Sequence, residues 1–422
     1  MTRQWLAVAA APFSMSIAVS ASAQELDNDL VIQPAIAQDY NRGRNVSVAE
    51  QPRPDYTANG VNLGGVKLYP RVEAGAGATS NTYLTRDSGD SSLFLYQQGS
   101  ARLNSQWSRH SLQISGTTTR REYLGESRRN ENLWAVTAAG RLDVQPSFKL
   151  EATINVSRQL QNLFSGEVTP TVAALSRYRR DYRLLRATYT QGRVRAFATF
   201  DQANFHFSPV ELRAGGELNQ SSRDRLITRL TAQVEYARSP SVALFTQASV
   251  NRIKYDDPPE LGSEKLGSKS IQVLGGVNVD IAGQIRGTVS LGYSVRDYDA
   301  SIYETVSGLL GEVQLQTFPT QRLTFGFDAR RSIEDITAGT VRPSIVTRAS
   351  LSLDYELLRN MIISASGGYI NQRRDGDTYR AAAGGRYLIS RRMSIQSTAS
   401  FSQRVANSVN ELRIEASVAY QL

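Results

Sequence analysis

The sequence has 422 residues, no cysteine and only two histidines, His110 and His206. Without cysteine there can be no disulfide framework, thiolate metal site or cysteine nucleophile, and two histidines leave little for a histidine-built metal centre. No run of about 18 or more apolar residues is present, which excludes a membrane protein built from spanning helices. A soluble enzyme, a fibre-like repeat protein and a β-barrel remain as candidate classes.

Residues 1–23 have the features of a cleaved secretory signal peptide. Arg3 supplies a positive charge, residues 5–19 are mainly apolar, and Ala-Ser-Ala at 21–23 is a small-residue cleavage site. The following segment, residues 24–66, contains scattered proline and glycine and shows little periodicity. We therefore expect a periplasmic N-terminal arm that is extended or disordered.

From residue 67 to residue 422, apolar and polar residues alternate in segment after segment, as in 285–296 and 412–422. Successive side chains of a strand point to opposite faces, so a period of two predicts strands with one apolar and one polar face. Small residues such as Ala74, Ala76 and Ala78 lie on the apolar face. They would pack the core of a soluble propeller or sandwich poorly, whereas lipid requires only that the face be apolar.

The connections between these segments alternate between two kinds. Tight turns are expected near residues 108, 146, 192, 240, 283, 319, 360 and 390, and longer polar loops near 82–91, 125–130, 161–180, 207–222, 256–267, 299–304, 333–344, 374–377 and 405–408. Eight turns and nine loops predict about 18 strands. An even strand number with short periplasmic turns and longer outer loops is typical of outer-membrane barrels. We predict an all-β fold, a transmembrane antiparallel up-and-down β-barrel over residues 67–422, in the bacterial outer membrane.

A barrel of this size encloses more space than side chains fill, so we expect a water-filled lumen unless loops or the arm occupy it. Only five of the 48 basic residues are lysines. The arginines placed on the inward, polar face are Arg71, Arg102, Arg141, Arg195, Arg225, Arg229, Arg286, Arg322, Arg330, Arg348, Arg380, Arg386 and Arg413. These arginines either brace the wall in ion pairs or line a path that favours acidic solutes.

Motifs for catalysis and cofactor binding are absent. The sequence has no Gly-x-Ser-x-Gly elbow and no phosphate-binding glycine loop. Turn parity places His110 and His206 on opposite sides of the membrane, so they cannot share a site. We expect no enzyme activity, no cofactor and no metal, although Asp256 and Asp257, in an outer loop, could meet a divalent cation. The arginines are spread along the strands of an exported chain, so nucleic acid is not an expected partner.

Two short motifs stand out at the start of the alternating region. One is Leu-Tyr-Pro-Arg-Val-Glu-Ala-Gly-Ala-Gly at 68–77 with Ser-Asn-Thr-Tyr at 80–83, and the other is Gln-Trp-Ser-Arg-His at 106–110 with Leu112. Both resemble motifs of an outer-membrane β-barrel porin family associated with exopolysaccharide export operons. The resemblance covers about residues 60–422. It implies a protein linked to polysaccharide synthesis or secretion and carries over no catalytic or binding residues.

These observations together predict an outer-membrane barrel that assists export or surface assembly of an acidic exopolysaccharide, through or beside an arginine-rich lumen. A general or anion-selective diffusion porin is the first alternative, and an outer-membrane enzyme is the second. The expected partners are outer-membrane lipids, the barrel-insertion machinery, and a polysaccharide or small anionic solutes.

Overall fold

The computed structural model describes residues 46–84, 90–161, 164, 175–212, 214–258, 267–281, 283–336, 342–372, 376–406 and 408–422. The signal peptide expected at residues 1–23 and the first part of the arm, residues 24–45, lie outside the described residues.

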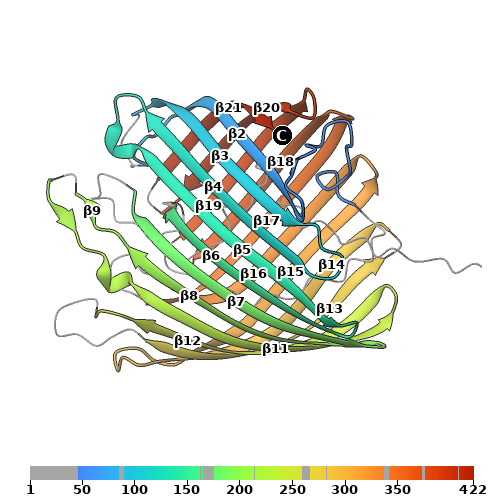
Figure 1. Ribbon diagram of the computed structural model, residues 1–422. Coiled ribbons are helices and arrows are strands. Elements are labelled where there is room, and N and C mark those ends of the chain that lie inside the picture. Colours follow the sequence, from blue (N-terminus) through green and yellow to red (C-terminus); the bar gives the residue numbers. More distant parts are fainter. Residues whose placement is uncertain are drawn as a thin grey trace, which may run out of the picture.

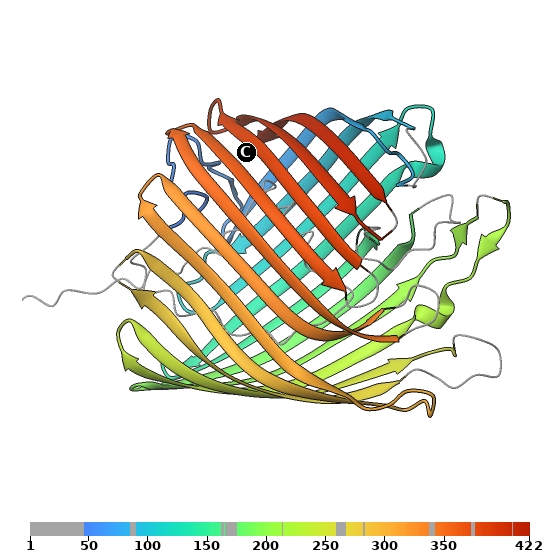
Figure 2. The same cartoon turned by 180° about the vertical axis from the view of Figure 1, so that it is seen from behind.

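The chain forms a closed antiparallel β-barrel of 18 strands (Figures 1 and 2). Consecutive wall strands pair with one another, and β2 pairs with β21 to close the cylinder. The wall strands are β2 (Val66–Thr79), β3 (Ser92–Ser105), β4 (Ser111–Tyr123), β5 (Glu131–Gln145), β6 (Phe148–Leu160), β7 (Arg177–Gln191), β8 (Val194–Phe207), β11 (Arg225–Ser239), β12 (Val242–Tyr255), β13 (Ser268–Ile281), β14 (Ile285–Tyr298), β15 (Val306–Thr320), β16 (Leu323–Ile336), β17 (Arg342–Leu358), β18 (Met361–Gln372), β19 (Gly376–Leu388), β20 (Met393–Arg404) and β21 (Val409–Gln421). The predicted fold class and strand number are confirmed.

Three short strands are not members of the closed ring of wall strands. Strand β1 (Val61–Asn62) pairs with the start of β2, and β9 (Val210–Glu211) pairs with β10 (Glu217–Leu218) in the long loop between β8 and β11. The part of the chain that the structure describes contains no helix with the length and apolar character needed to cross a bilayer.

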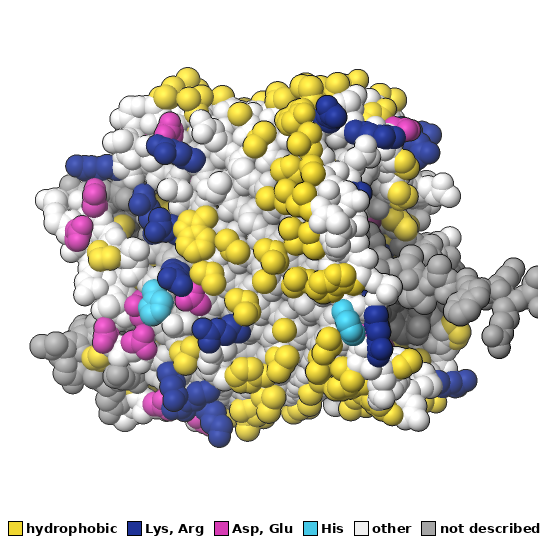
Figure 3. All heavy atoms as spheres, viewed as in Figure 1, with side chains coloured by type: hydrophobic (Ala, Val, Ile, Leu, Met, Phe, Trp, Pro, Cys, Tyr) yellow, Lys and Arg dark blue, Asp and Glu magenta, His cyan; other side chains and the backbone are white. Residues whose placement is uncertain are grey.

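The alternation in the sequence becomes two distinct faces of the wall. On β12, Phe245 and Gln247 are buried on the inner face, whereas Leu244 and Val250 are exposed on the outer face. The outer face carries apolar side chains over its middle (Figure 3), and some are as exposed as Leu291 at 72%. An apolar band around the outside of a closed barrel is the surface that contacts membrane hydrocarbon.

The two ends of the barrel differ, as the turn and loop lengths predict. The wall begins at Val66 and ends at Gln421, and both residues lie at the end that carries the short turns. This end is therefore periplasmic, and the longer loops face the outside. One predicted loop is shorter than expected: residues 333–336 and 342–344 of the segment near 333–344 are strand, because pairing between β16 and β17 continues from Ile333 with Ile345 to Ile336 with Arg342. Residues 337–341 lie outside the described residues.

Glycine is required where β2 meets β21. A Cβ atom on Gly75 would lie 2.2 Å from the carbonyl oxygen of Ala416, whereas a Cβ on Gly116 of β4 would meet no atom within 4 Å. We expect Gly75→Ala to lower the free energy of unfolding by about 1–3 kcal/mol, since the seam must shift to accept the methyl group. Gly116→Ala is the matched control and should change it by less than about 0.5 kcal/mol. Urea unfolding of the detergent-folded protein measures both, and equal losses would contradict the seam argument.

Candidate functional site

The predicted arginines lie on the inward face of the wall, except Arg322, which lies exposed in the turn between β15 and β16. Within the described residues, eight of them have a carboxylate oxygen within 4.0 Å. The pairs are Arg71 with Glu73, Arg141 with Asp143, Arg195 with Glu235, Arg229 with Asp201, Arg286 with Glu50, Arg330 with Glu312, Arg348 with Glu334, and Arg413 with Glu411. Four of these pairs join neighbouring strands, three join residues two apart on one strand, and Arg286 pairs with the N-terminal arm. Ion pairing inside the barrel therefore accounts for most of the inward arginines.

The remaining inward arginines make other contacts. The guanidinium of Arg225 lies 5.0 Å from the ring centroid of Phe205, and that of Arg380 lies 5.8 Å from the ring of Phe164. Arg386 donates to Gln396 Oε1 at 3.4 Å. These contacts place cations against aromatic and amide groups of the inner surface.

A cavity of about 380 Å³ lies against the inner wall of β2, β3, β4, β20 and β21. Two tyrosine rings, Tyr69 and Tyr96, stand on its wall beside three arginines, Arg71, Arg102 and Arg121. Hydroxyl and amide groups supply most of the other polar lining, from Gln98, Ser100, Ser115, Thr117, Thr119, Gln396, Thr398, Ser417 and Gln421. The spacing of these residues along their strands is the period of two, which aligns side chains from neighbouring strands on one face.

The charges around the cavity are not balanced. Counted over the lining side chains alone, Glu73 and Glu415 are acidic against the three arginines, which leaves 3 − 2 = +1. Arg121 contacts Glu415 at 3.5 Å and also pairs with Glu131, which lies beyond the cavity, at 2.9 Å. This cavity, with its surplus of positive charge, is the candidate site.

Arg102 carries that surplus. Within the described residues it has no carboxylate within 4.0 Å, and its guanidinium lies 5.2 Å from the centroid of the Tyr69 ring. Its Nε atom is buried and has no hydrogen-bond acceptor among the residues that the structure describes. An aromatic ring, many hydroxyl and amide groups, and a guanidinium with donors to spare are suited to a polar solute that bears an acidic group.

The arm enters the lumen at its periplasmic mouth. Val48 is fully buried, and its backbone N–H donates to Thr324 Oγ1 on β16 at 2.9 Å. Arg53 Nη2 lies 2.6 Å from Glu356 Oε2 on β17, and both side chains are buried. Residues 46–59 thus cross the inner surface from β14 to the turn before β20, where Arg391 donates to the carbonyl of Pro54.

The contact between Glu50 and Arg286 gives this docking a pH dependence. Burial raises the pKa of Glu50, but the hydrogen bond and the charge of Arg286 outweigh burial and set the pKa below its ordinary value. A carboxyl group whose pKa is lower when docked stabilises docking above its ordinary pKa. That contribution is lost as the pH falls through the lowered value.

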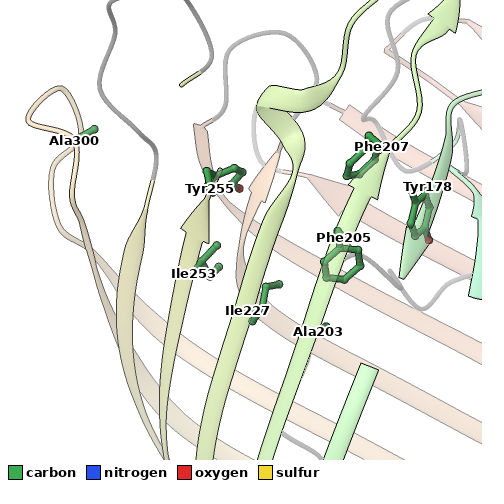
Figure 4. Close-up of a cluster of buried hydrophobic side chains, with 8 residues drawn as sticks. All are labelled: Tyr178, Ala203, Phe205, Phe207, Ile227, Ile253, Tyr255 and Ala300. Atoms are coloured by element: carbon green, nitrogen blue, oxygen red, sulfur yellow. The ribbon is translucent and has the colours of Figure 1, made fainter. Parts of the chain in front are cut away.

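The inner face is not polar throughout, which corrects the sequence prediction. At the loop end of the barrel, inward side chains form an apolar cluster (Figure 4). Its members are Tyr178, Ala203, Phe205, Phe207, Ile227, Ile253, Tyr255 and Ala300. The sequence does show this exchange of polar and apolar positions near the end of β8. There the aromatic residues Phe205 and Phe207 point inward, and the polar residues Asn204 and His206 occupy the outward positions.

A second inward contact comes from the loop between β6 and β7. Phe164 is buried, and its carbonyl accepts a hydrogen bond from Thr378 Oγ1 of β19 at 3.0 Å. Strand β19 lies well away from β6 around the wall, so this residue of the loop reaches across the lumen. The space inside the barrel is therefore narrowed from both ends.

The two histidines lie at opposite ends of the barrel, as turn parity predicts. His110 Nδ1 accepts from the backbone N–H of Asp143 at 3.2 Å at the periplasmic end. His206 lies outward at the loop end, where its Nδ1 is 3.3 Å from Asp224 Oδ2. Within the described residues, these histidines have no contact with a serine hydroxyl. His206, Asp224 and Asp256 place three possible ligand atoms within 4.8 Å of one another, outside the lumen and largely exposed.

The chain matches a family model described as "Putative beta-barrel porin 2" over residues 53–422. No curated protein matches it. Among solved structures, the copper transporter OprC aligns with a TM-score of 0.50 and 9% identity, covering 86% of this chain and 82% of that one. The outer membrane protein opdK from Pseudomonas aeruginosa aligns at 0.43 and 12% identity, covering 84% and 98%. The ferric enterobactin receptor PfeA from the same organism aligns at 0.45 and 9%, covering 84% and 80%. At these identities the likeness to OprC supports the fold alone.

Proposed function

The chain belongs to this β-barrel porin family of the bacterial outer membrane, and from that premise we propose that it is a channel for acidic saccharides. In the form that the sequence predicts, it assists export or surface assembly of an acidic exopolysaccharide. The luminal cavity around Arg102 is the observation that carries the proposal. A pyranose ring presents an apolar face to an aromatic side chain and hydroxyl groups to its rim, and Tyr69, Tyr96 and the surrounding hydroxyl and amide groups supply both kinds of contact.

The net positive charge of the cavity selects among saccharides. A carboxylate or sulfate on the sugar would accept hydrogen bonds from the free donors of Arg102. A neutral sugar would gain no such contact and would leave that cation without a counter-charge. We infer that acidic saccharides bind more tightly than neutral saccharides of equal size.

A diffusion porin selective for small anions is the second candidate. It is favoured by the size of the cavity, because about 380 Å³ is in the range of a small-molecule site rather than a groove for an extended polymer. The arm at the periplasmic mouth and Phe164 at the other end also restrict the cross-section available to a long chain.

Two measurements together test the proposal. Liposomes that contain the purified protein should swell faster in acidic disaccharides than in neutral disaccharides of the same size. A strain without the gene should carry less surface polymer. Acidic preference with unchanged surface polymer would favour the anion-selective porin, and equal swelling in both sugars would contradict both candidates.

A further inference from the structure

Charged side chains gather on the outward face of one sector of the wall, at the loop end of β6–β8 and β11–β13 (Figure 3). Lys254 illustrates the orientation, because it stands between Ile253 and Tyr255, which are buried on the inner face. The basic members, which we call the outer basic band, are Arg158, Arg177, Arg179, Arg183, Arg252, Lys254 and Lys269.

The strand register brings like charges of the outer basic band together. Arg158 on β6 is directly opposite Arg179 on β7, and Arg252 on β12 is directly opposite Lys269 on β13. Like charges directly opposite each other destabilise a sheet. Such pairs are tolerated where an external anion compensates them.

Acidic side chains compensate only part of this charge. Asp181 lies 2.9 Å from Arg179, and Asp299 lies 2.8 Å from Arg252. Asp297 of β14 is directly opposite Lys269 on its other side, without an ion pair between them. Within the part of the chain that the structure describes, five members have no carboxylate within 4.0 Å, and these are Arg158, Arg177, Arg183, Lys254 and Lys269.

The band lies at the height of the outer-leaflet headgroups. Toward the periplasm on the same outward face, the exposed side chains become apolar, with Leu230, Val250 and Ile271 in the band that contacts hydrocarbon. Arg183 marks the edge between the two bands, because it lies directly opposite the exposed Ile154. Beyond the outer basic band come the external loops. A cation on this rim can reach lipid phosphate but points away from the lumen, so it takes no part in the channel.

The outward positive charge is also concentrated on one side of the barrel. On β15–β21, Arg331 is the single basic residue on the outward face among strand residues with described side chains. A general need for positive charge at the membrane rim would distribute it around the whole circumference. Concentration in one sector instead indicates a localised partner.

We propose that the outer basic band is a binding surface for the phosphate groups of an anionic glycolipid in the outer leaflet. Guanidinium groups bind phosphate through paired donors, and basic clusters beside a membrane attract anionic headgroups. The position of the band, outside the wall and level with the headgroups, assigns the phosphate to a lipid rather than to a free solute. The proposal does not depend on what passes through the lumen.

Native mass spectrometry of the detergent-folded protein tests this, with bisphosphorylated lipid A, its dephosphorylated form and inorganic phosphate as probes. We expect the protein to bind the bisphosphorylated form about tenfold more tightly than the dephosphorylated form. The variant Arg158→Gln/Arg183→Gln/Lys254→Gln/Lys269→Gln should lose about tenfold in affinity, the equivalent of about 1.4 kcal/mol. None of these four residues has an ion pair within the described structure, so their replacement should not disturb folding.

The matched control is Arg120→Gln/Arg331→Gln, which removes outward charges from other parts of the wall and should bind as the unmodified protein does. If the fourfold variant fails to fold, Arg158→Gln/Arg183→Gln and Lys254→Gln/Lys269→Gln, tested separately, should each show a smaller loss. The proposal is overturned if the variants bind as tightly as the unmodified protein, if the control loses as much, or if inorganic phosphate binds as tightly as the glycolipid.

Discussion

Deletion of residues 46–59 is expected to raise the single-channel conductance several-fold. These residues occupy the periplasmic mouth, where Val48 is fully buried and the ion pair of Arg53 with Glu356 is shielded from water. Their removal opens cross-section at the narrowed mouth without cutting any strand of the wall. Recordings of the refolded protein in planar bilayers, with and without these residues, measure the effect.

The absence of cysteine supplies a control for this deletion. In Val48→Cys/Thr324→Cys, the two introduced thiols are the only ones in the chain, so a bifunctional thiol reagent can join the arm to the wall. The cross-linked protein should keep the low conductance. Each single-cysteine variant cannot form the cross-link, so its conductance should not change when the reagent is added. Equal conductance of the full-length and deleted proteins would show that the arm does not obstruct the path.

Arg102→Glu is expected to weaken block of the channel current by an acidic oligosaccharide by about tenfold or more. The substitution removes the cation that has no carboxylate partner among the described residues and places a negative charge beside the Tyr69 ring. Block by a neutral oligosaccharide of the same length should change little, because its ring contacts and hydroxyl partners remain. Titration of the current with both sugars gives the two affinities.

Arg141→Glu is the matched comparison for this variant, since Arg141 also faces inward but already has a carboxylate, Asp143, at 3.3 Å. It should leave block by the acidic sugar nearly unchanged. A similar loss in both variants would mean that the general charge of the lumen, and not the cavity, attracts the solute.

The sequence predicts the wall because its signal is local. Alternation of period two sets the two faces, and the lengths of turns and loops set the strand number and the orientation in the membrane. The bounds predicted for the loop near 333–344 are too wide because the pairing of Asp335 with Pro343 depends on the neighbouring strand. Proline cannot donate to the ladder, but as the second residue of β17 it lies near the strand end, where that loss is tolerated.

The candidate site was predictable only in part. The alternation along each strand predicts that these arginines point inward. Which residue each arginine contacts depends on the register between strands, and the sequence does not give that register. The ion pair of Arg286 with Glu50 joins residues 236 positions apart, and the contact of Phe164 with Thr378 joins residues 214 apart. Only the closed barrel shows that most arginines are paired and that Arg102 is not paired within the described residues.

The reversal potential of the channel across a salt gradient tests most directly whether this cylinder encloses an aqueous path with a positive bias. The measurement uses the protein without residues 46–59, so that the arm cannot obscure the result. With potassium chloride of unequal concentration on the two sides, the account predicts a potential of the sign that chloride sets. A potential of the opposite sign, or a barrel that passes no current, would contradict it.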